Sequence, residues 1–475
     1  MARDLTDGTD TVQPSPRPPG RRRRVRLLRR LLKGLLFAGG LVLVLLLLAV
    51  AATQTGAFRN WLRGFIVRQA SGALNGELRI GELHGNLFFG IELADVALMQ
   101  EGERVIALDR VRAHYSVFDF IARRVAIEEV ELGRLRILAR QTPEGWNLAR
   151  LTRPRTGAGR ARPSVTIGTL RLYDGEVVVE RQGRDTPTTV RDLDLLVGID
   201  VARDGFSIDL RHLSLEVDEP ALSLGRAAGR FTRRDDVLTI ENARVDLAAT
   251  NVAVDGAIRG LGTQAVADFS VKSGAFDFAE VGRLVPAISR IPLRPSFEAR
   301  VTGPFTQLGV AIDLRSRAGD ARGEVTVDLE GEERGVGGVM DLTRVDPAPW
   351  SWTPDVAGSV TGRAQFDIRF PDKARGLPVR GTFHVTGPAA RVAGYEAQQY
   401  AARGSFRGPR VRLDETTARA YGAQVSAAGT IEPVPGPERG VLYALQGRAR
   451  GVDLRRLPAG LPIPELDSNI STQYD

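Results

Sequence analysis

Cysteine is absent from this 475-residue sequence, and lysine is nearly absent, because it occurs only at Lys33, Lys272 and Lys373. Without cysteine there is no disulfide framework, no Cys-ligated zinc, no thiol nucleophile and no lipoprotein anchor. None of the lysines follows a glycine, so a phosphate-binding loop of the Gly-Lys-Ser/Thr type is excluded. These absences remove several classes of enzyme and of small secreted scaffold.

Signatures of catalysis and metal binding are missing as well. The four histidines, His84, His114, His212 and His384, show no pairing at metal-ligand spacing. Glycine clusters such as 335–338 lack the full G-x-G-x-x-G pattern, and no G-x-S-x-G sequence occurs. We therefore expect a protein that is not an enzyme and that uses no cofactor and no metal.

Positive charge is concentrated at the N-terminus. The formal net charge is +8, and residues 1–33 hold ten Arg or Lys against three Asp, a balance of +7 that leaves +1 for the rest. The body is therefore close to neutral, which does not favour a nucleic-acid partner. Residues 8–20 are rich in Thr, Pro and Gly, so we expect residues 1–33 to be a disordered basic arm.

An apolar segment follows this arm and predicts one transmembrane helix. Residues 34–52 carry no charge, and about nineteen residues at 1.5 Å per residue match the thickness of a bilayer core. We predict a signal anchor over 34–56, whose span includes Gly34, Leu35, Leu41, Leu45, Leu48 and Ala52. The basic flank that places the arm in the cytoplasm comprises Arg21, Arg22, Arg23, Arg24, Arg29, Arg30 and Lys33.

A cleaved signal peptide is the alternative, because Ala49 and Ala51 have the spacing of a cleavage site. Signal peptides have apolar regions of about 7–15 residues, which are shorter than this one. Both interpretations export the body of the chain. Residues 57–75, with Phe58, Trp61 and Phe65 at helical spacing, predict an amphipathic helix that lies on the membrane or packs against its own domain.

From residue 76 onward the apolar residues recur with a period of two, which is typical of β-strands with one apolar and one polar face. Long amphipathic helices are scarce here; the best candidates are 115–124 and 276–290. Parallel sheets covered by helices are thus excluded. The apolar face must meet another sheet, close into a barrel, or be covered by something other than protein.

These constraints predict a mostly β protein: an elongated, curled antiparallel sheet that forms a groove behind one N-terminal transmembrane helix. At about 11 residues per strand and turn, the body would contain roughly 36 strands. The residues expected to line the groove with apolar side chains are Ile80, Ile91, Leu93, Phe269, Val271, Val325, Val327, Phe366, Ile368, Phe383 and Val385. Weak repeats at 273–286, 342–354 and 450–462 each contain an aspartate near the start and a proline near the end, and they favour an extended array.

Residues 76–151 resemble the start of the AsmA-like superfamily, and most closely the TamB proteins of the translocation and assembly module. The motifs that carry the resemblance are the I-G-x-L-x-G turn at 80–85, the strands at 90–96, 105–108 and 130–138, and the close Gly145-Trp146-Asn147-Leu148. Residues 152–475 match only in style, as further β-repeats; the clearest piece lies at 167–179.

The resemblance implies an envelope-spanning β-taco groove in an inner-membrane protein whose bulk lies in the periplasm. It also implies transport of phospholipids, bound by their acyl chains, between the inner and outer membranes. For TamB itself it implies partnership with an Omp85-class outer-membrane barrel. The sequence ends at 471–475 without the C-terminal domain by which TamB proteins contact the barrel, so the barrel partnership is the least supported of these expectations.

The sequence leaves two alternatives to the lipid groove open. The first is a periplasmic scaffold or chaperone that offers strand edges to nascent outer-membrane proteins. The second is a string of closed β-sandwiches of roughly 100 residues each, anchored at the inner membrane.

Overall fold

The computed structural model describes residues 41, 44, 55–86, 90–115, 125–151, 164–184, 186–262, 264–330, 333–351, 357–371, 378–392, 394–434, 440–456 and 468–474. The predicted arm 1–33 with its basic flank lies outside these residues. So do Gly34, Leu35, Leu45, Leu48 and Ala52 of the predicted span, whereas Leu41 is helical and exposed. No helix within the described ranges is both long and apolar enough to cross a membrane.

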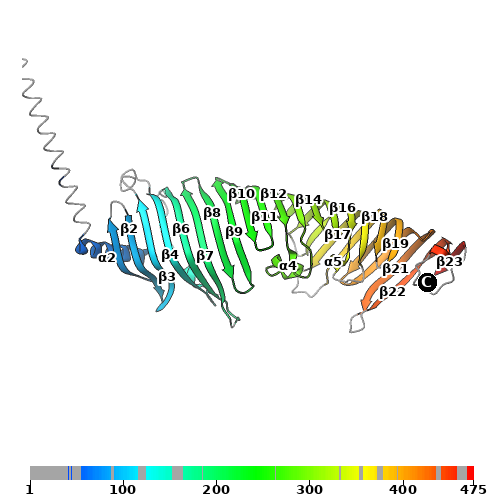
Figure 1. Ribbon diagram of the computed structural model, residues 1–475, viewed down its shortest axis with the longest axis horizontal. Helices are drawn as coiled ribbons and strands as arrows, with labels where there is room; N and C mark the ends of the chain where they lie inside the picture. Colours follow the sequence, from blue (N-terminus) through cyan, green and yellow to red (C-terminus); the bar gives the residue numbers. More distant parts are fainter. Residues whose placement is uncertain are drawn as a thin grey trace, which may run out of the picture.

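The body of the chain is one long sheet of 23 strands, in which strands that follow one another in sequence lie side by side (Figure 1). The strands of the N-terminal half are β1 (Glu77–Asn86), β2 (Gly90–Gln100), β3 (Glu103–Tyr115), β4 (Val125–Thr142), β5 (Gly145–Trp146), β6 (Val165–Glu180), β7 (Thr188–Val201), β8 (Gly205–Val217), β9 (Leu222–Arg234), β10 (Val237–Leu247) and β11 (Asn251–Arg259). Those of the C-terminal half are β12 (Val266–Ala275), β13 (Ser296–Pro304), β14 (Gln307–Ser316), β15 (Gly319–Asp328), β16 (Glu333–Val345), β17 (Gly358–Pro371), β18 (Arg380–Val392), β19 (Tyr395–Arg407), β20 (Arg410–Ala420), β21 (Ala423–Val434), β22 (Gly440–Val452) and β23 (Ile470–Tyr474).

Neighbouring strands are antiparallel with one exception, the parallel pairing of β4 with β6. Between these two strands the chain makes the short β5 and the 3-10 helix η1 (Asn147–Arg150). The β4–β6 pairing joins residues 76–151 and 152–475 in a single sheet, whereas the sequence suggested an N-terminal β-domain followed by a separate repeating β-groove. Because every other neighbour is antiparallel, the even-numbered strands from β2 to β22 all end at the same edge of the sheet.

The predicted number of strands, roughly 36, was too high. Most strands run to 10 residues or more, and β4 reaches 18. The estimate of about 11 residues per strand and turn came from strands of globular domains, which average about 5–6 residues. Here each strand is long because it follows the curvature of the sheet from one edge to the other.

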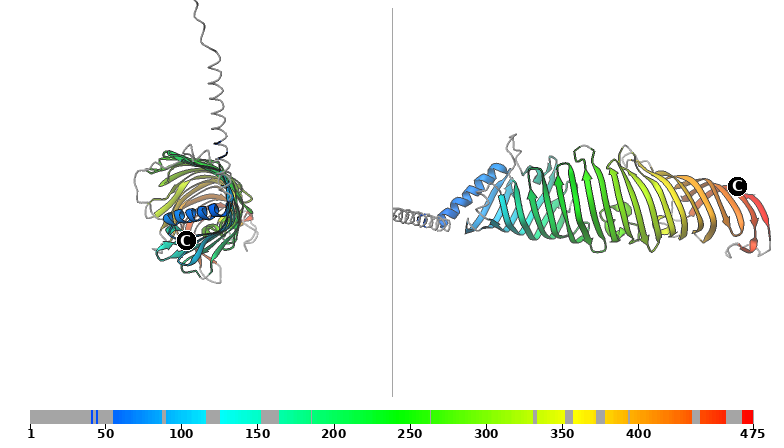
Figure 2. Two further views of the ribbon diagram at one scale, coloured as in Figure 1. Left: turned by 90° about the vertical axis from the view of Figure 1, so that its left-hand side faces the viewer. Right: turned by 90° about the horizontal axis from the view of Figure 1, so that it is seen from above.

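The sheet is curled along its length and is not paired with a second sheet among the described residues (Figure 2). In the end-on view the strands wrap around, and α2 (Gly56–Ala73) crosses the end of the curl. One continuous ladder from β1 to β23 is incompatible with separate sandwiches of roughly 100 residues, so that alternative was wrong. The mostly β, curled antiparallel sheet was predicted correctly.

Among the described residues, two small clusters of buried hydrophobic side chains form a core. One consists of Leu98, Val105 and Leu151, and the second of Ile291, Leu293 and Ala318. The first lies near the start of the sheet beside η1. The second lies under the insert that holds α4 (Phe278–Val281) and η2 (Pro286–Ile288), where sequence predicted one helix over 276–290. Two further short helices are α5 (Ala348–Ser351) and η5 (Leu454–Arg456).

Candidate functional site

One face of the sheet carries an unbroken apolar row from β3 to β22. In each pair of neighbouring strands the row residue of one strand lies directly opposite that of the next, and every member is aliphatic, aromatic or glycine. We call it the central row. Its members are Tyr115, Ile127, Ile167, Ile199, Ile208, Phe231, Ile240, Gly256, Phe269, Val301, Val310, Val325, Gly338, Phe366, Phe383, Gly404, Leu413, Gly429 and Leu445.

The central row is flanked by parallel rows of the same character. On one side, Val271 continues through Ala299 and Ile312 to Gly323. On the other, Val327 continues through Val336 to Ile368. Because neighbouring strands lie about 4.8 Å apart, these rows form a continuous apolar band along the sheet.

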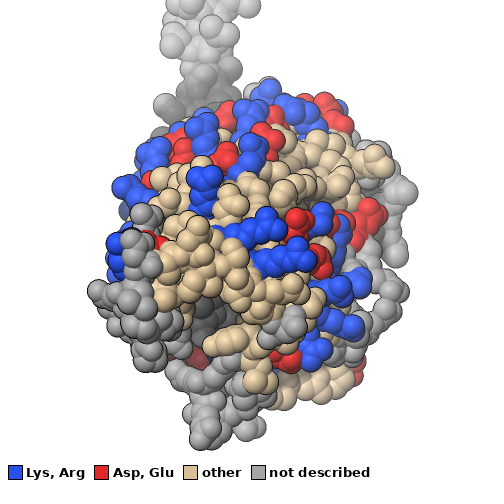
Figure 3. Space-filling model, turned by 90° about the vertical axis from the view of Figure 1, so that its right-hand side faces the viewer, with Lys and Arg blue, Asp and Glu red and all other residues tan. Residues whose placement is uncertain are grey.

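The opposite face is charged, and its charges generally complement each other between strands. Glu92, Arg112, Glu131 and Arg171 lie opposite one another in turn, so the sign alternates. Arg112 contacts Glu92 at 3.1 Å and Glu131 at 3.6 Å. Viewed from the C-terminal end, charged side chains lie mainly along the outer contour and uncharged ones lie within it (Figure 3). The apolar face is therefore the concave one.

Within the part of the chain that the structure describes, no second layer covers the side chains of the concave face. Central-row residues are half-buried, apart from Gly404, which is buried. A side chain enclosed between two sheets would be almost fully buried, since protein interiors are close-packed. At the rim, Phe370, which is on the same side of β17 as Phe366, is 43% exposed. The concave face is thus an apolar surface partly open to solvent.

Aromatic rings lie over glycines on this face. Phe383 lies opposite Gly404, and a Cβ atom at Gly404 would come within 2.8 Å of the ring. Phe406 lies opposite Gly381, where an added Cβ atom would come within 2.7 Å of the ring. Tyr400 lies opposite Gly387, where an added Cβ atom would come within 2.7 Å of the tyrosine hydroxyl. A ring beside a glycine occupies the space that the missing side chain leaves, an arrangement that also stabilises sheets.

Bulges bend the strands and keep the apolar residues on one side. Asp174, Asn242 and Arg344 have positive φ values of 56°, 52° and 51° inside their strands. In each, the neighbouring strand supplies a side-chain acceptor for the bulged backbone N–H: Asp194 Oδ1 at 3.0 Å, Asp255 Oδ1 at 2.6 Å and Thr361 Oγ1 at 3.0 Å. A bulge increases local twist and bending, so these positions give the sheet its curl.

Three helical inserts lie at one edge of the sheet, where β12, β16 and β22 end. They begin at Asp277, Asp346 and Asp453, the aspartates of the weak sequence repeats. Each carboxylate accepts a backbone N–H of the following turn: that of Ala279 at 2.9 Å, Ala348 at 3.0 Å and Arg455 at 3.2 Å. The rings of Phe278 and Trp350, from the first two inserts, meet at 5.9 Å. The repeats therefore correspond to equivalent, aspartate-capped turns along one rim.

Helix α2 closes the N-terminal end of the curl. Arg63 Nη1 donates to Gly81 O at 2.9 Å, and Asn75 N donates to Leu151 O at 2.8 Å. Phe58, Trp61 and Phe65 form a ladder of rings with centroid separations of 5.5 and 5.7 Å. Trp61 is 57% exposed. The helix carries three arginines and no acidic residue, so α2 itself is aromatic and basic.

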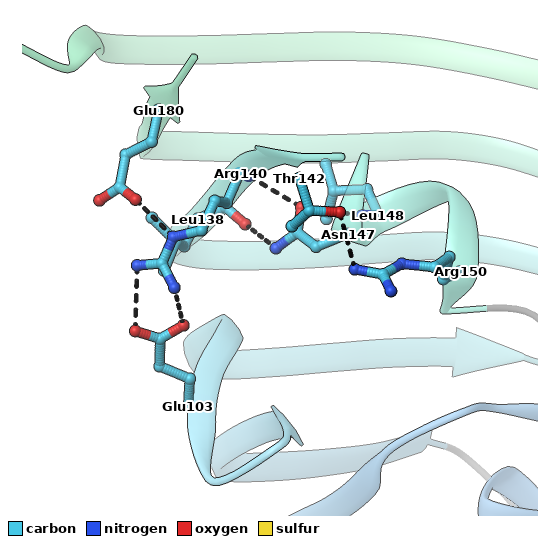
Figure 4. Close-up of polar contacts among 8 residues, drawn as sticks. All are labelled: Glu103, Leu138, Arg140, Thr142, Asn147, Leu148, Arg150 and Glu180. Carbon is cyan, nitrogen blue, oxygen red and sulfur yellow. Dashed lines mark hydrogen bonds and ion pairs between the residues drawn. The ribbon is translucent and has the colours of Figure 1, made fainter. Parts of the chain in front are cut away.

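A polar network holds β3, β4 and β6 together beside η1 (Figure 4). Arg140 bridges Glu103 and Glu180, each at 2.5 Å, and these ion pairs raise the pKa of its guanidinium. The buried Asn147 accepts the N–H of Arg140 at 2.8 Å and donates to Leu138 O at 2.8 Å. The Gly-Trp-Asn-Leu motif thus folds back on the end of β4, and Arg140 of β4 links β3 to β6.

The structure places the predicted lining residues in the apolar rows. Phe269, Val325, Phe366 and Phe383 belong to the central row. Val271 and Val385, and likewise Val327 and Ile368, lie in the rows beside it. Ile91 and Leu93 lie opposite Ala113 and Val111 on β3, whereas Ile80 is buried at 8% exposure, opposite Val96.

Sequence reasoning missed the aromatic–glycine pairs, the Arg140 network and the capped bulges. Each depends on the register between strands, which brings together partners 13 to 40 residues apart in the sequence, as in the pairs Asn242 and Asp255 and Arg140 and Glu180. For Asn147 the sequence did contain a signal, because the motif Gly145-Trp146-Asn147-Leu148 stood out, although its structural role was not predicted. Comparison of the chain with protein-family models, with curated proteins and with solved structures gave no match.

Proposed function

We propose that the chain is an inner-membrane-anchored, AsmA-like protein related to TamB, and that its periplasmic groove moves phospholipids between the inner and outer membranes. The observation that carries this proposal is the central row: an unbroken apolar path over 19 strands, half-buried and without a covering layer among the described residues. In this proposal the missing layer is supplied by acyl chains.

The energetics favour such a ligand. Each methylene group removed from water contributes about 0.8 kcal/mol, so a two-chain lipid strongly prefers the groove to the aqueous phase. The headgroup stays at the open rim, because a polar group enclosed without hydrogen bonds is costly. Members of the central row differ little in chemistry from strand to strand, so no single site holds the lipid tightly enough to stop its movement.

The N-terminal end suits contact with the donor membrane. The predicted anchor at 34–56 precedes α2 directly, and α2 presents the exposed Trp61 beside Phe65. Aromatic side chains favour the headgroup region of a bilayer, and basic residues favour anionic lipid. A lipid that leaves the membrane beside α2 would meet the first apolar residues of the sheet.

A scaffold for outer-membrane proteins remains the competing function, and depletion of the protein in cells separates the two. The lipid proposal predicts that phospholipid flow to the outer membrane falls first, and that outer-membrane proteins decline later. A primary loss of outer-membrane proteins with normal lipid flow would support the scaffold and contradict the conduit.

A further inference from the structure

The insert between β12 and β13, residues 276–295, ties together several turns at one rim of the groove. We call it the rim clasp. Arg283 Nη1 donates to Ala221 O, in the turn between β8 and β9, at 2.7 Å. The buried carboxylate of Glu280 accepts the N–H of Ala249, in the turn between β10 and β11, at 3.1 Å. The rim clasp therefore reaches back along the rim as far as β8.

The rim clasp also reaches forward. Arg317 Nη2, from the turn between β14 and β15, donates to Pro292 O at 2.7 Å. The ring of Phe278 meets that of Trp350, in the insert between β16 and β17, with the centroids 5.9 Å apart. The helices of the two inserts, α4 and α5, lie at the same edge of the sheet (Figure 1). From β8 to β17, every turn at this rim is therefore held by a contact with the rim clasp.

A file of aromatic rings leads from the concave face onto the rim clasp. Phe297 is on the concave face, because it lies four residues before Val301 of the central row on β13. Its ring packs against that of Phe276 at a centroid separation of 5.6 Å, and Phe276 packs against Phe278 at 5.3 Å. Trp350, which is 36% exposed, ends the file. The apolar surface of the groove thus continues onto this rim.

The row of the concave face next to the rim clasp is uncharged, and all of its members except one serine are apolar or glycine. Neighbours in this row lie directly opposite one another. The row comprises Ser273, Phe297, Leu314, Ala321, Leu342 and Gly362. Side chains of this kind suit an acyl chain and not a headgroup.

The opposite rim carries positive charge on the concave face. Arg233 lies between Phe206 and Leu238 in a concave row, and Arg334 lies opposite Phe370. Both arginines are exposed. The even-numbered strands end at the rim of the clasp, so β9 ends and β16 begins at the opposite rim, where these arginines lie. An arginine can lay its apolar stem on apolar neighbours and keep its guanidinium in water.

The turn after β9 adds carboxylates to this opposite rim. Asp235 and Asp236 are exposed, and Arg233 Nε donates to the backbone oxygen of Asp235 at 3.2 Å. The two rims therefore differ in chemistry. One is apolar and built over by the rim clasp, and the other offers charges of both signs beside the apolar groove. A zwitterionic headgroup, with one phosphate and one ammonium, matches the second rim.

We propose that phospholipids lie in the groove in one orientation, with their acyl chains toward the rim clasp and its aromatic file and their headgroups at the opposite rim beside Arg233 and Arg334. The chains gain from burial against the rings, while the headgroup stays in water and meets opposite charges. This inference rests on the proposed function, because it concerns the orientation of the lipid that the groove would carry.

The test uses the full chain in vesicles with phosphatidylethanolamine that carries a photoreactive group either at the end of an acyl chain or on a headgroup that keeps its ammonium charge. Adducts are mapped by mass spectrometry. The headgroup form should label the strand ends that hold Arg233 and Arg334 about tenfold more than the rim clasp. The acyl form should label the concave face, including Phe297, and also Trp350.

The outcomes separate the orientation from the conduit. Acyl labelling of the concave face together with equal headgroup labelling of both rims overturns the orientation and leaves the conduit intact. Folded protein with no acyl labelling of the concave face contradicts the conduit, and the orientation fails with it.

The double variant Arg233→Gln/Arg334→Gln tests the two arginines. It should lose about tenfold of the headgroup labelling at their rim and keep its acyl labelling. The matched control is Arg230→Gln/Arg363→Gln, which removes the same charge from the convex face, where each arginine contacts an aspartate. It should label like the wild type. Headgroup labelling that is unchanged in the double variant, or that falls equally in the control, overturns the role of the arginines.

Discussion

The ring of Phe383 lies over Gly404, its direct cross-strand neighbour, and a Cβ atom at Gly404 would also come within 2.1 Å of the backbone oxygen of Arg412. Glycine is therefore the only residue that fits at position 404 without a shift of the backbone. The pair shows how the concave wall is built: a large ring on one strand fills the space that a glycine leaves on the next.

Replacing Gly404 with alanine should destabilise the sheet by about 1–3 kcal/mol, because the added methyl group meets backbone that cannot yield easily. Urea unfolding of the full chain in detergent measures the difference. Gly309→Ala is the control, since a Cβ there would be 3.6 Å from its nearest neighbour, an ordinary contact. Equal stability of the two variants would show that the close approach at Gly404 is relaxed at little cost.

The insert that begins at Asp277 should depend on its capping carboxylate. Asp277 is 18% exposed, accepts the N–H groups of Ala279 and Glu280, and pairs with Arg294 at 2.7 Å. Asp277→Ala should cost about 1 kcal/mol, as the loss of an N-cap typically does. Asp277→Asn keeps an acceptor for the backbone and should cost less. Unfolding of both variants in urea measures the order, and a reversed order would contradict the capping role.

The same aspartate gives a dependence on pH. Burial raises the pKa of Asp277, but the hydrogen bonds from Arg294 and from the backbone of Glu280 and Ala279 outweigh it and lower the pKa below its usual value. A depressed pKa means that this stabilisation is complete above the unfolded value, near 3.9, and is lost as pH falls through the folded value. The stability gap between wild type and Asp277→Asn should therefore be constant at neutral pH and shrink below about pH 4. A gap that grew on acidification would contradict the assignment.

A charge placed on the central row should block lipid movement without unfolding the sheet. Val325 lies opposite Val310 and Gly338 on the concave face, and its chain neighbour Thr326 is exposed on the convex face. Val325→Asp should slow transfer of tail-labelled phospholipid between vesicles about tenfold, since a carboxylate repels acyl chains. Thr326→Asp should leave the rate unchanged. Equal rates for the two variants would count against the concave face as the path.

Helix α2 should lie at the level of the lipid headgroups. In a variant that keeps only Trp61 among the four tryptophans, brominated lipids should quench the fluorescence most strongly when bromine is near the headgroup. A variant that keeps only Trp350, in α5, is the control and should not be quenched. Absence of quenching at Trp61 in vesicles of phosphatidylethanolamine and phosphatidylglycerol would place α2 away from the bilayer.

Much of the fold could be predicted because alternation is a local signal. Phe366 and Ile368, or Val325 and Val327, show the concave face within three residues, and the scarcity of long helices then favours a single curled sheet. The aspartates Asp277, Asp346 and Asp453 were also visible as a repeat, although their capping role was not.

Register could not be predicted, and the site depends on it. Nothing near Arg380 in the sequence indicates that Arg407 lies opposite, because the two residues are at the far ends of the hairpin formed by β18 and β19. The same holds for Phe383 with Gly404. The number of strands was overestimated because the assumed length per strand was too short: bulges such as that at Asn242 let one strand continue through a bend, so most strands exceed the length usual in globular domains.

The most direct test of the central claim places photo-crosslinking residues in the full chain in cells at Phe269, Phe366 and Phe383, and at their convex neighbours Ser270, Asp367 and Thr382. The conduit predicts phospholipid adducts at all three concave positions and none at the convex ones. Folded protein without adducts at the concave positions, or with equal labelling of both faces, would contradict it.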